Sequence, residues 1–243
     1  GFQRILNVYT KEKRSRSTRH TELSWTLNIL IKKNAAVTFL LYNYLMKLCI
    51  FSGTFNPIHN AHIKMAEYVL ENYGFDKIIF IPAYKPPHKE YQDNMCIHRY
   101  NMVKLAIQNN PKFEISDIEY KNEGKSYSYL TALELYKQYD IDGKINFIIG
   151  TDAFEKIETW YETDKFKKLV DFIVFIRENE PVNFDDFRKK GYNFEFAKMN
   201  FVDISSTELR ERIQKHETVE NLIPKEVEEY IKNNGLYRNT EMA

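Results

Sequence analysis

Short apolar runs recur along most of the chain and predict the strands of a sheet. Runs rich in Ile, Val, Leu and Phe cover residues 46–51, 77–81, 145–149 and 170–176. Continuous apolar runs of this length are typical of parallel strands that are buried on both faces. Residues 194–202 predict one further strand near the C-terminus.

Amphipathic stretches separate these runs and predict helices. Apolar residues return every three to four positions within residues 60–72, 98–109, 127–139 and 152–157. Strands that alternate with such helices predict an α/β fold, in which helices cover both faces of a parallel sheet.

The C-terminal part predicts two more helices, at residues 205–215 and 224–234. Gly235 follows the second helix, at a position where a left-handed residue commonly ends a helix. The expected fold is therefore a parallel α/β sheet with additional C-terminal helices.

The first 45 residues differ in composition from the rest of the chain. They hold eight Lys or Arg against two Glu, a net charge of +6, which leaves −5 for the remainder of a chain of net charge +1. Such a segment indicates a targeting peptide, a disordered arm or residues introduced by cloning, with an ordered extra element as the alternative. The expected division is a basic extension at residues 1–45 and one domain at residues 46–243, with Met46 as a natural start.

The overall composition is typical of a soluble protein with a sizeable core. The 243 residues are 43% hydrophobic and 28% charged, and the mean hydropathy is −0.53. The longest apolar-leaning segment, residues 35–51, is interrupted by polar residues and is short for a membrane span. The acidic balance beyond residue 45 argues against a nucleic-acid-binding domain. Cys49 and Cys96 form no ligand cluster, which is typical of a cytoplasmic protein.

The loop after the first predicted strand carries candidate chemistry. It contains Gly53 and Pro57, and it ends in His59 and His62 at the predicted start of a helix. Ligands of parallel sheets bind beside the carboxyl ends of strands, where helix N-termini attract phosphate. Histidines three residues apart share one helix face, so both could bind the same phosphate. The alternative is one histidine that caps the helix and one on the surface; zinc would need a third ligand, which is not nearby.

A second candidate lies where the helix predicted for residues 205–215 begins. Ser205 and Glu208 match a capping box, which explains the helix start without any ligand. Ser206 and the planar guanidinium of Arg210 would in addition suit a polyphosphate. From these residues alone, both interpretations stay open.

Taken together, the two stretches resemble the signatures of the adenylyltransferase and cytidylyltransferase superfamily. Residues 53–62 match Gly-x-Phe-x-Pro-x-His-x-x-His, and residues 204–210 match Ile-Ser-Ser-Thr-x-x-Arg. Within the superfamily, residues 81–89 and 126–131 resemble segments of bacterial nicotinate-nucleotide adenylyltransferases. The resemblance covers about residues 46–238 and implies a Rossmann-like, doubly wound parallel sheet with C-terminal helices.

The resemblance also implies an activity and a site. The activity would be transfer of an adenylyl group from ATP to nicotinate mononucleotide in NAD biosynthesis, with Mg²⁺ bridging phosphate oxygens. The implied catalytic residues are His59, His62 and Arg210. The residues implied to bind ATP are Gly53, Thr54, Phe55, His59, His62, Gly150, Asp152, Ile204, Ser205, Ser206 and Arg210. The residues implied to bind the mononucleotide are Asn56, Lys85, His88, Lys89, Ser128, Thr131, Trp160, Tyr161 and Arg177.

Some of these residues have plainer alternatives. In the resemblance, Asp152 accepts hydrogen bonds from ribose, Trp160 stacks on the pyridine ring, and Ser128 meets the pyridine carboxylate. Asp152 could instead cap the following helix, and Trp160 could be an ordinary half-buried aromatic. The loop with His88 and Lys89 could simply be solvated.

Other functions stay open at this stage. Ser52, Asn56 and Ala61 stand where the family usually has Gly, an acid and Gly, but no histidine of the motif is lost. The alternatives are adenylylation of nicotinamide mononucleotide or of phosphopantetheine, and a non-catalytic nucleotide-sensing module. The segment 159–161 with its Trp argues against the phosphopantetheine enzymes. Small molecules are the expected partners, without nucleic acid or membrane; the oligomeric state is open, with a homodimer as one option.

Overall fold

The computed structural model describes most of the predicted domain. The described residues are 45–87, 93–121, 124–176, 184–199 and 204–238. From Met46 onward they belong to one compact unit. Three predicted site residues, His88, Lys89 and Arg177, lie outside the described residues, as does nearly all of the predicted extension.

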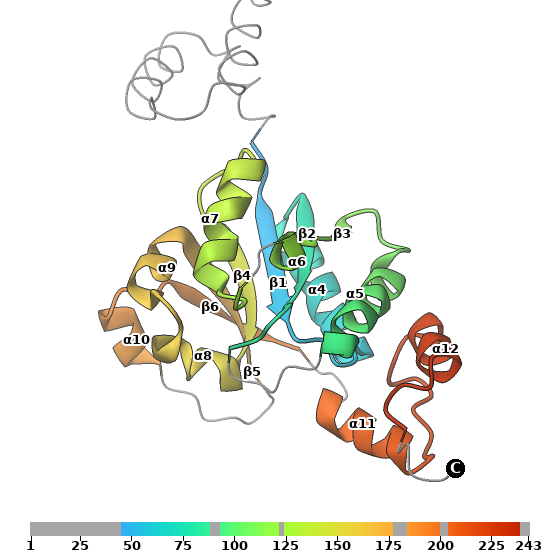
Figure 1. The fold of residues 1–243 in the computed structure, drawn as a ribbon. Helices are drawn as coiled ribbons and strands as arrows, with labels where there is room; N and C mark the ends of the chain where they lie inside the picture. The colour runs from blue at the N-terminus through green and yellow to red at the C-terminus, as the bar shows by residue number, and fades with distance from the viewer. Residues whose placement is uncertain (1–44, 88–92, 122–123, 177–183, 200–203, 239–243) are drawn as a thin grey trace, which may run out of the picture. The chain divides into compact units, whose positions relative to one another are not determined.

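Six parallel strands form the centre of the molecule (Figure 1). They are β1 (Leu48–Gly53), β2 (Lys77–Pro82), β3 (Phe113–Ile115), β4 (Ile145–Gly150), β5 (Val170–Ile176) and β6 (Phe194–Lys198). Their order in the sheet is β3-β2-β1-β4-β5-β6, so the direction of winding reverses between β1 and β4. This order confirms the predicted α/β fold with a doubly wound parallel sheet. In such sheets the point of reversal, at the carboxyl ends of the strands, is where ligands bind.

Helices connect the strands and continue beyond the last one. The connecting helices are α4 (Asn60–Tyr73), α5 (Asp93–Ile107), α6 (Ile118–Lys121), α7 (Ser128–Gln138), α8 (Thr151–Phe154), the 3₁₀ helix η1 (Ile157–Thr159), α9 (Thr163–Leu169) and α10 (Asp185–Lys189). The C-terminal helices are α11 (Ser206–Gln214) and α12 (Lys225–Asn233).

The alternation of side chains along each strand builds two hydrophobic cores. In β1, Cys49 and Phe51 face one core, which α4, α5, α11 and α12 complete. Leu48 and Ile50 face the other core, which includes buried residues of α6, α7, α8 and α9. Successive residues of a strand point to opposite faces, so a continuous apolar run fills both cores at once. This is the physical reason why continuous apolar runs predict the strands of this sheet.

Some boundaries and short elements differ from the predictions. The helix predicted at 152–157 is two short pieces, α8 and η1, and the helix predicted at 98–109 is α5, which begins earlier. Strand β3 has three residues, too few to produce a periodic signal. The strand predicted at 194–202 ends at Lys198 in β6, and residues 200–203 lie outside the described part.

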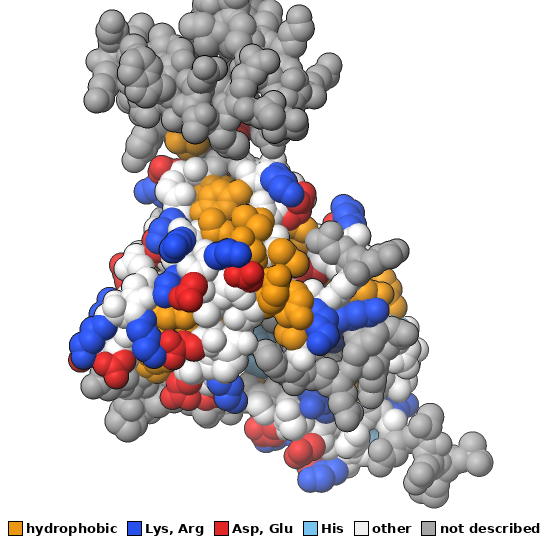
Figure 2. Space-filling model, turned by 60° about the vertical axis from the view of Figure 1, so that its left-hand side comes forward, with side chains coloured by type: hydrophobic (Ala, Val, Ile, Leu, Met, Phe, Trp, Pro, Cys, Tyr) orange, Lys and Arg blue, Asp and Glu red, His pale blue; other side chains and the backbone are white. Residues whose placement is uncertain are grey.

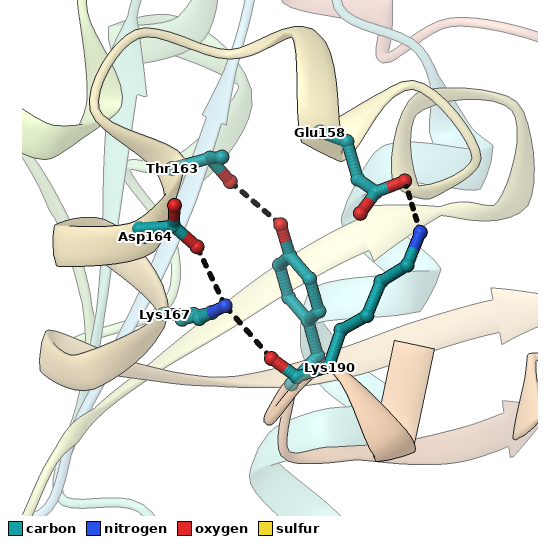
Figure 3. Close-up of polar contacts among 6 residues, drawn as sticks. Glu158, Thr163, Asp164, Lys167 and Lys190 are labelled. Atoms are coloured by element: carbon teal, nitrogen blue, oxygen red, sulfur yellow. Dashed lines mark hydrogen bonds and ion pairs between the residues drawn. The ribbon is translucent and has the colours of Figure 1, made fainter. Parts of the chain in front are cut away.

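Polar contacts join η1, α9 and the turn after α10 (Figure 3). Lys167 Nζ donates to Asp164 Oδ1 at 2.6 Å and to the carbonyl oxygen of Lys190 at 2.7 Å. Lys190 Nζ donates to Glu158 Oε2 at 2.8 Å. Exposed ion pairs contribute at most about 1 kcal/mol each, so these contacts fix the geometry of a loop more than they stabilise the fold.

Candidate active site

A cavity of about 1070 Å³ opens at the carboxyl ends of β1, β4 and β5. Its walls come from the loop after β1 and from the first turns of α4, α8 and α11. Three helix N-termini at one cavity offer several backbone N–H groups that have no partner within their own helices. The cavity therefore suits a ligand with several negative charges.

Most residues predicted to bind ATP meet in this cavity. The lining residues from that set are Thr54, Phe55, His59, His62, Gly150, Asp152, Ile204, Ser205, Ser206 and Arg210. Gly53 is not among them, but it lies directly behind the lining, since a Cβ atom there would come within 3.2 Å of the Phe55 ring. Asn56, predicted to bind the mononucleotide, also lines the cavity. The binding roles themselves stay predictions.

The two histidines begin helix α4 and stack on each other. His59 is the N-cap residue, and the ring centroids of His59 and His62 are 3.6 Å apart with planes tilted by 28°. The backbone N–H of His59 donates to Nδ1 of His62 at 3.3 Å. Because Nδ1 accepts this bond, the proton of neutral His62 is placed on Nε2, which makes Nε2 a donor.

His59 is held as a neutral imidazole. Its side chain is only 5% exposed, and desolvation lowers its pKa from 6.5 to about 4. Its Nδ1 atom is buried without a hydrogen-bond partner among the described residues. A buried nitrogen without a partner costs about 1–3 kcal/mol, a cost that a polar ligand group can offset.

Helix α11 is tied to the loop after β1 by side chains of its first turns. Arg210 Nη1 donates to the carbonyl oxygen of Asn56 at 2.9 Å. Ser206 Oγ donates to the carbonyl oxygen of Pro57 at 2.9 Å. These two bonds bring the second motif to the first, although about 150 residues separate them along the chain.

Ser205 has the structural role that its motif predicts. Its side chain accepts a hydrogen bond from the N–H of Glu208 at 3.1 Å, as a helix cap does. The carboxylate of Glu208 instead pairs with Arg212 at 2.8 Å. The capped helix and the polyphosphate site are therefore compatible, because the cap uses Ser205 and leaves Ser206 and Arg210 on the cavity wall.

Asp152 lies inside the first turn of α8, and Gly150 is the N-cap residue. The interpretation of Asp152 as a helix cap is therefore wrong. Asp152 provides the only carboxylate on the cavity wall as far as the structure describes it. No group of three or more His, Cys, Asp or Glu within the described ranges could hold a metal ion.

The predicted pyridine-binding residues lie elsewhere. Lys85, Ser128, Thr131, Trp160 and Tyr161 do not line the cavity. Their roles in binding the mononucleotide stay predictions, and their surroundings differ from one another.

Trp160 and Thr131 have partners inside the protein. The indole of Trp160 is half-buried and packs against Phe147 and Phe166, with centroids 5.9 Å and 6.1 Å away. Thr131 is 3% exposed and its hydroxyl donates to Glu119 Oε1 at 2.9 Å. The packing of Trp160 is that of an ordinary half-buried aromatic, the plainer of its two interpretations.

Tyr161, by contrast, lies at the surface. Its side chain is 47% exposed, and its ring stacks on Tyr127 with centroids 4.4 Å apart. Leu130 of α7 is 44% exposed, and Figure 2 shows hydrophobic side chains gathered near the middle of the face drawn there. Exposed aromatic rings of this kind are available to stack on a ligand.

Arg99 is a residue of the site that the sequence interpretation left without a role. It is 3% exposed and donates to the carbonyl oxygens of Thr54 at 2.9 Å and Tyr84 at 3.0 Å, and also to that of Ala83. Its charge also acts on the buried Glu119, whose pKa burial raises and Arg99 lowers. Arg99 matches a basic residue of the resembling family, but a single Arg in a helix is indistinguishable from a surface Arg by sequence pattern, so nothing predicted its bonds to the carbonyls.

Tyr237 is a second such residue. Its hydroxyl donates to Asn56 Oδ1 at 2.6 Å, and burial raises its pKa above the ordinary value. Tyr237 lies after the last helix, and it lines the cavity together with Arg238. Nothing in the local sequence indicates that the C-terminal residues return to the first loop.

Comparisons with known proteins agree with this geometry. The cytidylyltransferase-like family model matches residues 50–212, and the fold and cavity are those of a nucleotidyltransferase. The Bacillus subtilis protein named "Nicotinate-nucleotide adenylyltransferase" is 40% identical over 192 residues, which cover 79% of this chain and 98% of the relative. A "Probable nicotinate-nucleotide adenylyltransferase" from Clostridium tetani is 42% identical over 202 residues, covering 79% and 99%.

A solved structure agrees at the level of the fold. The Plasmodium falciparum nicotinic acid mononucleotide adenylyltransferase complexed with NaAD superposes with a TM-score of 0.66 at 23% identity, covering 79% of this chain and 97% of that one. The family model and the two relatives show that the chain belongs to the nicotinate-nucleotide adenylyltransferase family of nucleotidyltransferases. None of its described helices is long and apolar enough to cross a membrane.

Proposed function

We propose that this enzyme transfers the adenylyl group of ATP to nicotinate mononucleotide, giving nicotinate adenine dinucleotide and pyrophosphate. The observation that carries the proposal is the convergence of His59, His62 and Arg210 on one cavity. Membership of the family named for this reaction supports the choice of substrate. The cavity of about 1070 Å³ is at the upper end for a single small ligand, in keeping with two substrates.

The reaction needs no covalent intermediate on the protein. An oxygen of the mononucleotide's phosphate attacks the α-phosphorus of ATP in line with the bond to the β-phosphate. The new P–O bond forms while that bond breaks, and pyrophosphate leaves with the electron pair. Such a step depends on positioning and on stabilisation of negative charge, which helix N-termini, imidazoles and guanidinium groups provide.

The geometry suggests how the roles divide. His62, whose Nε2 is a donor, and the N-terminus of α4 would bind the α-phosphate. Arg210 has five N–H donors, and its bonds to Asn56 and to Thr207 leave others for the β- and γ-phosphates. His59 would gain the partner that its buried Nδ1 lacks, and the negative charge beside it would raise its pKa from about 4.

Mg²⁺ fits this site as a companion of ATP. Mg²⁺ is commonly held by substrate phosphates, water and one or two carboxylates, and Asp152 is the carboxylate on the described cavity wall. When bound, the ion would neutralise phosphate charge and favour departure of pyrophosphate.

The proposal also covers the cellular compartment of the protein and the boundary between residues 45 and 46. Cys49 and Cys96 are both buried and form no disulfide within the described residues, which suits a cytoplasmic protein. Residues 1–45 would be an extension without a catalytic role. A chain shortened to residues 46–243 should then turn over at the rate of the full chain.

Release of pyrophosphate tests the proposed function. Full-length protein with ATP, Mg²⁺ and nicotinate mononucleotide should release pyrophosphate, and parallel reactions should contain nicotinamide mononucleotide and phosphopantetheine. His62→Ala should lower the rate by at least about tenfold, which corresponds to about 1.4 kcal/mol of transition-state stabilisation. The exposed His216 lies outside the cavity, so His216→Ala is the matched control. ATP binding without turnover of any acceptor would favour a nucleotide-sensing module and overturn the proposal.

A further inference from the structure

The last described residues of the chain return to the active-site cavity. Tyr237 and Arg238 follow α12, and both line the cavity that contains His59, His62 and Arg210. The bond from the Tyr237 hydroxyl to Asn56 Oδ1, 2.6 Å long, anchors this segment to the loop after β1. Leu236, the residue before, is 8% exposed and belongs to the core. Arg238 is therefore attached to a fixed point of the site.

The three arginines on the cavity wall differ in what their guanidinium groups already bind. Arg99 is 3% exposed and donates to backbone carbonyls. Arg210 donates one hydrogen bond to the carbonyl of Asn56 and one to the hydroxyl of Thr207. Arg238 is exposed, and no hydrogen bond or ion pair joins it to any other described residue. Of these arginines it has the most donors available to a ligand.

Arg238 and one face of α11 line the same cavity. Thr207, Arg210 and Gln214 line the cavity along one face of α11, a length of about 10 Å at 1.5 Å per residue. Arg238 lines both this cavity and a smaller groove with Ile213 and His216 at the C-terminal end of α11. A triphosphate that begins at the histidines and follows α11 would point its terminal phosphates toward Arg238.

We propose that Arg238 is a further substrate-binding residue, which contacts the terminal phosphates of ATP and the pyrophosphate that forms from them. The inference rests on the proposed function. A guanidinium forms strong charge-assisted hydrogen bonds to phosphate, and the described cavity wall opposes it with the single carboxylate of Asp152. Arg210 then orders the loop after β1 as well as binding phosphate, whereas Arg238 acts on the phosphates alone.

The test compares ATP with AMP, which lacks the terminal phosphates. Arg238→Ala should weaken ATP binding about tenfold in titration calorimetry, the loss of a charge-assisted bond. It should change AMP binding by less than about twofold, because no contact to the adenylyl part is removed. Arg238→Lys should recover most of the ATP affinity. Lys225→Ala removes a positive charge from α12 at a position that lines neither the cavity nor the smaller groove, and it should leave both affinities unchanged.

Either of two results would overturn this inference: unchanged ATP affinity in Arg238→Ala, or equal weakening of ATP and AMP. Turnover by the wild-type enzyme is measured separately. If the wild type turns over and the Arg238→Ala variant binds ATP with unchanged affinity, only the role of Arg238 is rejected. ATP binding that depends on Arg238, without turnover of any acceptor, rejects the proposed reaction and keeps the contact.

Discussion

The loops after β1 and β2 leave neighbouring strands at the same edge of the sheet, but they are held in different ways. The loop after β1 is bound from outside by α11, through Arg210 and Ser206. The loop after β2 is bound from inside, by Arg99 to the carbonyl of Tyr84 and by Ser126 to the backbone of Lys85 at 3.0 Å. Ser206 and Arg210 lie on the cavity wall, whereas Ser126 lies outside it and the buried Arg99 directs its donors to backbone carbonyls.

This difference explains which part of the site a sequence can reveal. For the first loop, two of the side chains that fix the backbone, Ser206 and Arg210, belong to a motif that is proposed to bind the ligand. In the second loop, the fixing residues are Arg99, Glu119 and Ser126, which stand in separate segments. Residues 88–92, which continue that loop, lie outside the described part of the chain.

The largest expected effect comes from the residue that joins the two loops. Arg99→Met removes donors from Thr54 and Tyr84 and leaves Glu119 buried without its cation. Breaking such a buried charge arrangement should cost about 3 to 5 kcal/mol in the free energy of unfolding, measured in urea. The double variant Arg99→Met with Glu119→Gln should regain part of this loss. A cost below about 1 kcal/mol would mean that the loops do not depend on Arg99.

Next in size is a change in α11 that affects only the loop after β1. Arg210→Ala should lower kcat/KM for ATP about a hundredfold, because it removes phosphate donors and frees the carbonyl of Asn56. Arg212 lies on the same helix and pairs with Glu208 outside the cavity. Arg212→Ala should stay within about twofold of the wild type, since exposed pairs contribute little. Equal losses in both variants would show that α11 acts only as a structural support.

His59 predicts a dependence of stability on pH. Its pKa is about 4 in the fold and 6.5 in the unfolded chain, so on acidification the unfolded state takes up the proton first. The contribution of neutral His59 to the free energy of unfolding is complete above pH 6.5 and is lost as the pH falls toward 4. Between pH 7.5 and pH 5 the loss should be about 2 kcal/mol.

The comparison variant for this measurement is His59→Asn, which cannot be protonated. Urea unfolding of both proteins at several pH values isolates the contribution of His59 from that of other groups. The variant should lose less stability on acidification than the wild type by about 2 kcal/mol. Parallel curves for the two proteins would mean that His59 is not desolvated as the structure has it.

The smallest effect concerns Tyr161, which follows η1 and stacks on Tyr127. Tyr161→Ala should raise KM for nicotinate mononucleotide about threefold and leave KM for ATP unchanged, if the exposed ring stacks on the substrate. Leu130→Ala removes a similarly exposed apolar side chain and is the control. Trp160→Ala is less informative, because Trp160 packs on Phe147 and Phe166 and its loss would disturb the core. An unchanged KM in Tyr161→Ala would remove Tyr161 from the binding site.

The fold was predictable where burial leaves a periodic pattern. The apolar runs of β1, β2, β4 and β5 gave the strands, and the alternation with helices gave the parallel sheet. Strand β3 and the pieces around η1 were missed because elements of three residues carry no period. Their positions depend on tertiary contacts rather than on local pattern.

The same distinction applies to the site. The meeting of His59, His62 and Arg210 at one cavity was predictable, because they belong to two motifs that resemble the family's signatures; their roles stay predictions. Arg99 and Tyr237 were not predictable, because their roles depend on carbonyl and amide partners that are far away in the sequence. No local pattern distinguishes a tyrosine that anchors the segment after α12 from a tyrosine in the core.

The two bonds from α11 to the loop after β1 end on backbone carbonyls, those of Asn56 and Pro57. Every amino acid has a backbone carbonyl, so these two hydrogen bonds do not depend on which side chains the loop carries. Asparagine in place of the usual acid at position 56 therefore leaves the bond from Arg210 to the backbone unchanged. Side chains of the loop can therefore change while the two hydrogen bonds that hold α11 against it are kept.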